Sequence, residues 1–119
     1  MRTRVLVVVS AGIEMATGIA LIAVPGFVGR ALLGADLSAA GIAVARVAGL
    51  GLFSLGIACW PGGNEVTPQT ARALFIYNLL AALYLGYLRV GAGFVSYLLW
   101  PACVLHALLM ILLAIQHKR

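Results

Sequence analysis

Residues 5–24 read VLVVVSAGIEMATGIALIAV, an apolar run long enough to cross a lipid bilayer as one helix. A membrane-spanning helix needs about 20 predominantly apolar residues. Three more runs rich in Leu, Ala, Val and Gly follow, and none shows the period-two alternation of a barrel strand. We expect helices at residues 5–25, 39–60, 69–89 and 94–116. The sequence therefore predicts an all-α fold, an integral membrane four-helix bundle with short loops.

The composition excludes an ordinary soluble protein. Of the 119 residues, 64% are hydrophobic and only 9% are charged, whereas a soluble domain has about 25% charged residues. This chain has too few polar groups to cover a surface that faces water. We expect one transmembrane domain over residues 1–119.

The basic residues predict the orientation in the membrane. The net charge is +5, but the positive residues are scattered at predicted helix ends and are not interleaved with aromatic residues, so we expect no nucleic-acid partner. The side that carries both termini collects Arg2, Arg4, Arg72, Lys118 and Arg119. The other side has Arg30 and Arg89. The positive-inside rule then places both termini in the cytoplasm, with the chain in the cytoplasmic (inner) membrane.

Three local signals concern the helix ends. The connection PGFVGRALLGADLS, residues 25–38, predicts a short amphipathic turn at the outer interface, followed by a helix N-cap at Asp36 or Ser38. Thr67 followed by a proline predicts the N-cap of the third long helix. Pro101 lies inside the fourth apolar run, where it predicts a kink.

Each predicted long helix carries one strongly polar residue near its middle: Glu14, Arg46, Asn78 and His106. A charge in the centre of a bilayer costs roughly 3 kcal/mol on insertion scales, so such residues should face one another, water or a ligand. With a rise of about 1.5 Å per residue, Glu14, Asn78 and His106 fall within roughly 3 Å of their helix centres. Arg46 falls roughly 6 Å from its centre, toward the outer side, which leaves a Glu14–Arg46 ion pair within reach. Tyr77 and Tyr84 form an adjacent stripe, for which two positions stay open: beside the same site or at the lipid headgroups.

Two interpretations of these residues stay open. In the first, Glu14 and Arg46 neutralise each other, and Asn78 and His106 complete a hydrogen-bond network that fixes helix register. In the second, the residues bind a small molecule, a proton or a lipid-like headgroup. Glu14 would then exchange a proton and His106 would relay it, while Asn78 would orient a ligand and Arg46 would hold an anionic or carbonyl group.

Catalytic and metal-binding motifs are missing from the sequence. The two histidines, His106 and His117, do not complete a metal site with one glutamate, and they do not form a haem-ligating pair within the membrane. The chain also has no nucleophile elbow, phosphate-binding loop or pair of intramembrane carboxylates. We therefore expect no enzymatic activity, no metal and no cofactor.

Two segments resemble the DoxX-like group of small bacterial four-helix membrane proteins. They are GIEMATGIALIAVPG, residues 12–26, and the Arg-x-x-Gly within VARVAGLGLFSLG, residues 44–56. The helix count and chain length are also similar. Some members of that group are linked with quinone-dependent oxidoreductase complexes, so the resemblance implies an accessory or ligand-binding role.

These observations lead to three functional hypotheses. The first is a non-enzymatic membrane protein with a buried polar intramembrane site, in a binding or accessory role. The second is a proton-coupled carrier of small molecules that uses Glu14. The third is an accessory subunit of a quinone-linked redox complex. Besides the lipid bilayer, the open partners are a small apolar or quinone-like ligand, a second copy of the chain and a larger membrane complex.

Overall fold

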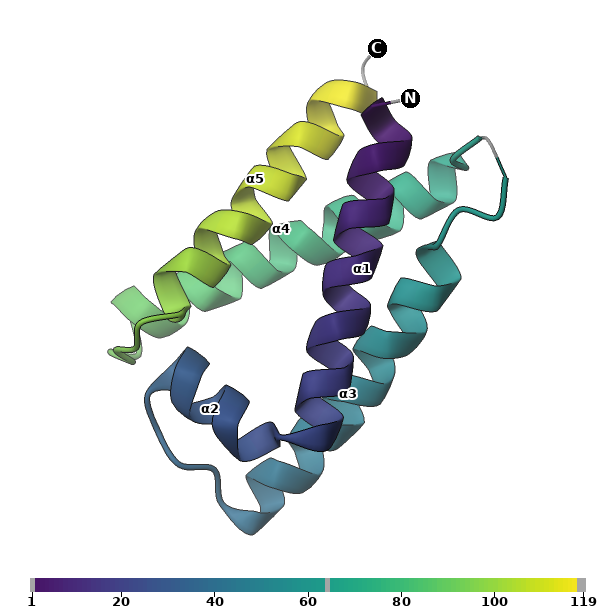
Figure 1. Cartoon of the computed structure of the whole chain (residues 1–119). Coiled ribbons are helices and arrows are strands. Elements are labelled where there is room, and N and C mark those ends of the chain that lie inside the picture. The colour runs from purple at the N-terminus through teal and green to yellow at the C-terminus, as the bar shows by residue number, and fades with distance from the viewer. Residues whose placement is uncertain (1, 64, 118–119) are drawn as a thin grey trace.

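The computed structural model describes residues 2–63 and 65–117, with side chains placed through residue 116. Its secondary structure consists, within these residues, of the helices α1 (Arg2–Ala23), α2 (Pro25–Leu33), α3 (Ala39–Cys59), α4 (Pro68–Val90) and α5 (Leu99–His117) (Figure 1). The predicted all-α class is confirmed. Helices α1, α3, α4 and α5 are each long and apolar enough to cross a membrane, which is the pattern of a multi-pass membrane protein.

The predicted amphipathic turn is a full helix, α2. Pro25 has no backbone N–H to continue the hydrogen bonding of α1, but its fixed φ suits the first position of a new helix. Gly34 ends α2 in the left-handed conformation, with φ 68°, and its N–H donates to the Arg30 carbonyl at 3.0 Å. A Cβ at Gly34 would overlap the Val95 carbonyl oxygen. Only glycine therefore fits at this close approach of two chain segments.

Two of the long helices begin at side-chain caps. The Ser38 hydroxyl accepts from the Gly41 N–H at 3.0 Å at the start of α3. Thr67 accepts from the Thr70 N–H at 3.2 Å, and α4 starts at the proline that follows Thr67. Of the two predicted caps for α3, the structure uses Ser38. Asp36 instead pairs with Arg30.

Helix α5 differs from the predicted fourth span. It begins at Leu99 rather than at residue 94, because the chain reverses around Gly91 and Gly93, and the Phe94 N–H donates back to the Leu88 carbonyl at 2.9 Å. Pro101 consequently lies in the first turn of α5, where a backbone N–H has no intrahelical partner. The kink predicted at Pro101 was wrong, since the proline removes no hydrogen bond from the helix interior.

The long helices form two closely packed pairs, α1 with α3 and α4 with α5 (Figure 1). Glycine allows the first pair to approach backbone to backbone. A Cβ at Gly18 would lie 2.6 Å from the Gly49 carbonyl oxygen, and one at Gly56 would lie 2.7 Å from the Ala11 carbonyl oxygen. Such contacts between small residues are how membrane helices gain packing energy without a hydrophobic driving force.

The two ends of the molecule are held together differently. We call the end at which α1 begins and α5 ends the terminal end, and the opposite one the far end (Figure 1). A cluster of buried side chains from four helices lies toward the terminal end: Val7, Ala11, Cys59, Leu74 and Leu113.

At the far end, α2 is tied to the segment that precedes α5. The Ser96 hydroxyl donates to the Leu32 carbonyl at 2.5 Å, and the Leu98 N–H donates to the Ala31 carbonyl at 3.3 Å. The far end is therefore joined by hydrogen bonds of the connecting segments in addition to buried side chains such as Ala31 and Leu99.

Candidate polar intramembrane site

Four of the five predicted site residues lie in the interior, on α1, α4 and α5. Glu14 is 1% exposed and Asn78 is 0% exposed, while Tyr77 and His106 are partly buried. Arg46 is exposed. The structure therefore divides the predicted constellation into a buried cluster and one outlying arginine.

Asn78 is the centre of a hydrogen-bond chain that joins α1, α4 and α5. Its amide nitrogen donates to the Leu74 carbonyl at 2.8 Å and to the Ser10 hydroxyl at 3.1 Å. Its amide oxygen lies 2.8 Å from His106 Nδ1. Three helices therefore meet through the side chain of Asn78.

The orientation of the Asn78 amide determines the tautomer of His106. The Leu74 carbonyl can only accept, so the amide nitrogen must face it and the amide oxygen must face the imidazole. His106 then carries a hydrogen on Nδ1 and donates it to Asn78. The remaining ring nitrogen, Nε2, is left for another interaction.

Ser10 is a member of the site that the sequence analysis did not identify, and Thr17 lies at similar helical spacing on the other side of Glu14. Ser10 is fully buried and belongs to the hydrogen-bond chain, whereas Thr17 is exposed. Ser10 precedes Glu14 by one helical turn, so spacing alone places it beside the site. Spacing alone did not distinguish Ser10 from Thr17, because the buried face of α1 is narrower than the helical spacing indicates.

Glu14 lies beside this chain without a strong partner. Tyr77 is the side chain that interacts with its carboxyl group. The same Tyr77 ring meets His106 edge-on, with the ring centroids 5.8 Å apart and the planes at 81°. Glu14 Oε1 is buried and has no hydrogen-bond partner among the described residues. The cluster is thus a nearly complete network with one unused acceptor.

Arg46 does not neutralise Glu14. Its Nε donates to the Ile22 carbonyl at 3.2 Å, and the ion pair that the structure places within residues 2–63 and 65–116 joins Arg30 to Asp36. Ile22 lies in the last turn of α1, where carbonyls lack intrahelical donors and the helix dipole favours a cation. The end of α1 therefore offers Arg46 a partner that the sequence pattern does not reveal, and the proposed Glu14–Arg46 pair does not form.

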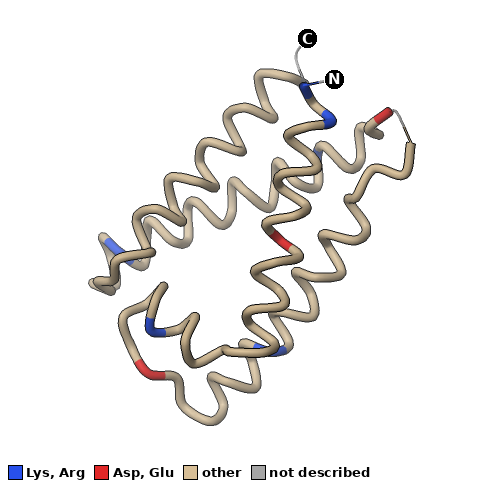
Figure 2. Tube along the Cα trace, in the orientation of Figure 1, with Lys and Arg blue, Asp and Glu red and all other residues tan. Residues whose placement is uncertain are grey.

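The distribution of charge leaves Glu14 alone. Figure 2 shows one acidic position midway along α1, while the other charged positions of the described chain lie toward the ends of the long helices or in the connections. Within the described residues, no three His, Cys, Asp or Glu side chains gather where they could hold a metal ion. The carboxyl, amide, hydroxyl and imidazole groups of Glu14, Asn78, Ser10 and His106 can form hydrogen bonds and exchange protons.

Comparison of the chain with protein-family models, with curated proteins and with solved structures found no match.

Proposed function

We propose that the protein is a small non-enzymatic membrane protein that uses the cluster around Glu14 as an intramembrane site in a binding or accessory role. In this proposal the four long helices cross the cytoplasmic membrane as a bundle, with both termini in the cytoplasm. The apolar composition and the four helices of spanning length support insertion, and the basic residues near the termini support the orientation.

The observation that carries the proposal is the unpaired oxygen of Glu14. A buried polar atom without a partner is unfavourable by about 1–3 kcal/mol, and more if the group is charged. Purely structural networks usually satisfy all of their members. A network in which one buried oxygen of Glu14 has no partner among the described residues suits a ligand that donates a hydrogen bond.

Mass spectrometry tests whether a ligand occupies the cluster. The full chain is purified from membranes in a mild detergent, and native mass spectra are recorded for the unmodified protein, for Glu14→Gln and for Arg46→Gln. We expect a bound species of defined mass on the unmodified protein and on Arg46→Gln. Arg46 is the control because its side chain bonds to the Ile22 carbonyl and not to Glu14. The species should be lost from Glu14→Gln. An empty unmodified protein, together with a lower thermal stability of Glu14→Gln, would show that the cluster only fixes packing.

One observation supports a proton-coupled carrier as a second candidate. Because Glu14 is not ion-paired with Arg46, it can gain or lose a proton without breaking a salt bridge. Proteoliposomes that contain a pH-sensitive dye should then dissipate an imposed pH gradient faster than empty liposomes, and Glu14→Gln should abolish the difference. Equal rates for the two proteins would exclude the carrier function and leave the binding role intact.

The resemblance to the DoxX-like group supports the accessory form of the proposal. A subunit of a quinone-linked complex should be purified together with partners that carry redox cofactors. Isolation of the chain alone from native membranes, after mild cross-linking, would contradict that form.

A further inference from the structure

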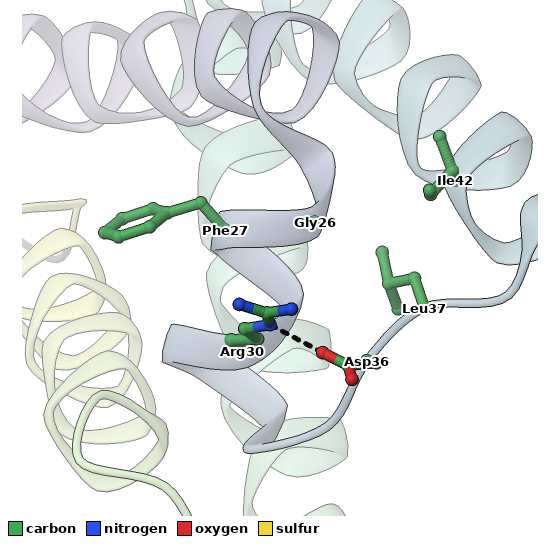
Figure 3. Close-up of a pocket in the computed structure, with 6 residues that line it drawn as sticks. All are labelled: Gly26, Phe27, Arg30, Asp36, Leu37 and Ile42. Atoms are coloured by element: carbon green, nitrogen blue, oxygen red, sulfur yellow. Dashed lines mark hydrogen bonds and ion pairs between the residues drawn. The ribbon is translucent and has the colours of Figure 1, made fainter.

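The far end of the molecule contains a groove that is separate from the Glu14 cluster. Its volume is about 500 Å³, and it is lined by Gly26, Phe27, Arg30, Asp36, Leu37 and Ile42 (Figure 3). These residues come from α2, from the connection that follows it and from the first turn of α3. The groove therefore lies between the end of one spanning helix and the beginning of the next, at the depth where a bilayer has its headgroups.

The polar part of the groove is an ion pair that is open to its surroundings. Arg30 Nε and Asp36 Oδ1 are 2.5 Å apart, and the two side chains are 73% and 77% exposed. The contact uses one guanidinium nitrogen and one carboxylate oxygen. Both terminal nitrogens of Arg30 and the second oxygen of Asp36 thus remain for a ligand. An exposed pair of this kind is worth less than about 1 kcal/mol, so a ligand can displace it without a large penalty.

The rest of the groove is apolar. Leu37 packs directly on Gly29, where a Cβ would lie 2.7 Å from Leu37 Cγ. Leu37 and Ile42 line one side of the groove, and Phe27 points away from them (Figure 3). Phe27 is 65% exposed. A charged pair bordered by exposed apolar side chains matches a molecule that has a polar head and an apolar tail.

We propose that this groove binds the headgroup of a zwitterionic phospholipid with a primary ammonium group, that is, a phosphatidylethanolamine. The terminal nitrogens of Arg30 bind the lipid phosphate, since a guanidinium presents paired donors to two oxygens. The lipid ammonium donates to the Asp36 carboxylate, and the acyl chains run along Phe27 and Ile42. A phosphatidylglycerol has no cation for Asp36, and the quaternary ammonium of a phosphatidylcholine has no hydrogen to donate. This inference requires only that α1 and α3 cross the membrane and is independent of the role of Glu14.

Lipid retention measured by native mass spectrometry tests the proposal. The delipidated full chain is mixed with equal amounts of short-chain phosphatidylethanolamine, phosphatidylcholine and phosphatidylglycerol of matched tails. The unmodified protein should retain the ethanolamine lipid roughly fivefold more than either competitor, which corresponds to about 1 kcal/mol. Equal retention of the three lipids, or preference for phosphatidylglycerol, would overturn the proposal.

Two variants assign the contacts. Arg30→Gln should reduce retention of the ethanolamine and choline lipids alike, because the phosphate contact is shared. Asp36→Asn should remove the difference between the ethanolamine and choline lipids, because the choline lipid loses only a charge attraction whereas the ethanolamine lipid also loses a hydrogen bond. Arg89→Gln removes a cation from the last turn of α4, outside the groove, and should change nothing. Circular dichroism verifies that the variants keep their helices, and an unaltered lipid preference in both groove variants would contradict the assignment.

Discussion

The cluster around Glu14 and the groove at Arg30 both place charged side chains in an apolar chain, but their surroundings are opposite. Glu14 is 1% exposed and has an oxygen without a partner. Arg30 and Asp36 are 73% and 77% exposed and bond to each other. Burial makes the unpaired group in the cluster energetically important, whereas exposure makes the paired groups in the groove nearly neutral. The number of ion pairs is therefore a poor guide to which polar region matters for stability.

Arg46 lies between these extremes and explains the difference. It belongs to a long helix, as Glu14 does, yet it is exposed, and it donates to the Ile22 carbonyl at the end of α1 instead of pairing with a buried group. A long side chain can reach such an end, because its stem packs along apolar surface while its head moves toward polar groups. Glu14 has a shorter side chain on the face that packs against other helices, so its carboxyl group cannot reach a helix end.

The largest effect is expected from the seam that holds α1 against α3 and so buries Glu14. In Gly18→Leu, the new side chain would begin 2.6 Å from the Gly49 carbonyl oxygen and 2.7 Å from the Phe53 nitrogen, and backbone atoms cannot rotate away. We expect a loss of about 3 kcal/mol or more in the free energy of unfolding. Titration with SDS in mixed micelles, followed by tryptophan fluorescence, measures it. Gly12→Ala on the same helix, where a Cβ meets nothing within 4 Å, is the matched control and should be neutral.

Asn78→Leu should have the next largest effect, because it removes the side chain that joins three helices. The substitution leaves the His106 Nδ1 hydrogen without its acceptor and Ser10 without its donor. The expected loss is about 1–3 kcal/mol in the same titration. Nitrogen NMR of labelled histidine gives a second readout: the unmodified protein should hold the hydrogen of His106 on Nδ1, and the variant should lose this preference. An identical spectrum in the variant would show that Asn78 does not set the tautomer.

Arg46→Gln should be milder, since it removes one charged hydrogen bond at a helix end. We expect a loss of about 0.5–1 kcal/mol. The sharper measurement is the double-mutant cycle with Glu14→Gln. The two effects should add within about 0.5 kcal/mol, because the side chains share no partner. A coupling energy well above that value would show that Glu14 and Arg46 interact directly, which would contradict the structure.

The smallest effect is expected in the groove. A cycle of Arg30→Gln and Asp36→Asn should give a coupling energy below about 1 kcal/mol, in spite of the 2.5 Å contact. The coupling should fall further when salt is added, because exposed charges are screened. A coupling energy as large as the loss expected for Asn78→Leu would show that the exposed groove contributes as much to stability as the buried cluster.

Much of the architecture was predictable from local signals. Hydrophobic length alone predicted the four long helices. Capping residues predicted the start of α4 at Thr67 and narrowed the start of α3 to Asp36 or Ser38, of which the structure uses Ser38. These properties depend on residues within one or two turns of each other. The start of α5 was missed because the apolar residues from Phe94 onward are compatible with helix. The reversal at Gly93, the bond from the Phe94 N–H to the Leu88 carbonyl and the contacts of Ser96 and Leu98 with α2 keep them out of the helix.

The sequence by itself determined that the chain is all-α, that four of its helices are long enough to span a membrane, and that each of them carries a polar residue near its middle. Only the tertiary structure decided which of these residues meet. Hydropathy and depth specify a position along a helix axis, but they do not specify rotation about it or the choice of neighbour. Close glycine contacts set the rotation of α1 against α3. Arg46 donates to the Ile22 carbonyl at the end of α1 and does not pair with Glu14. Glu14 was thereby left without an ion-pair partner, and one of its carboxyl oxygens has no hydrogen-bond partner among the described residues.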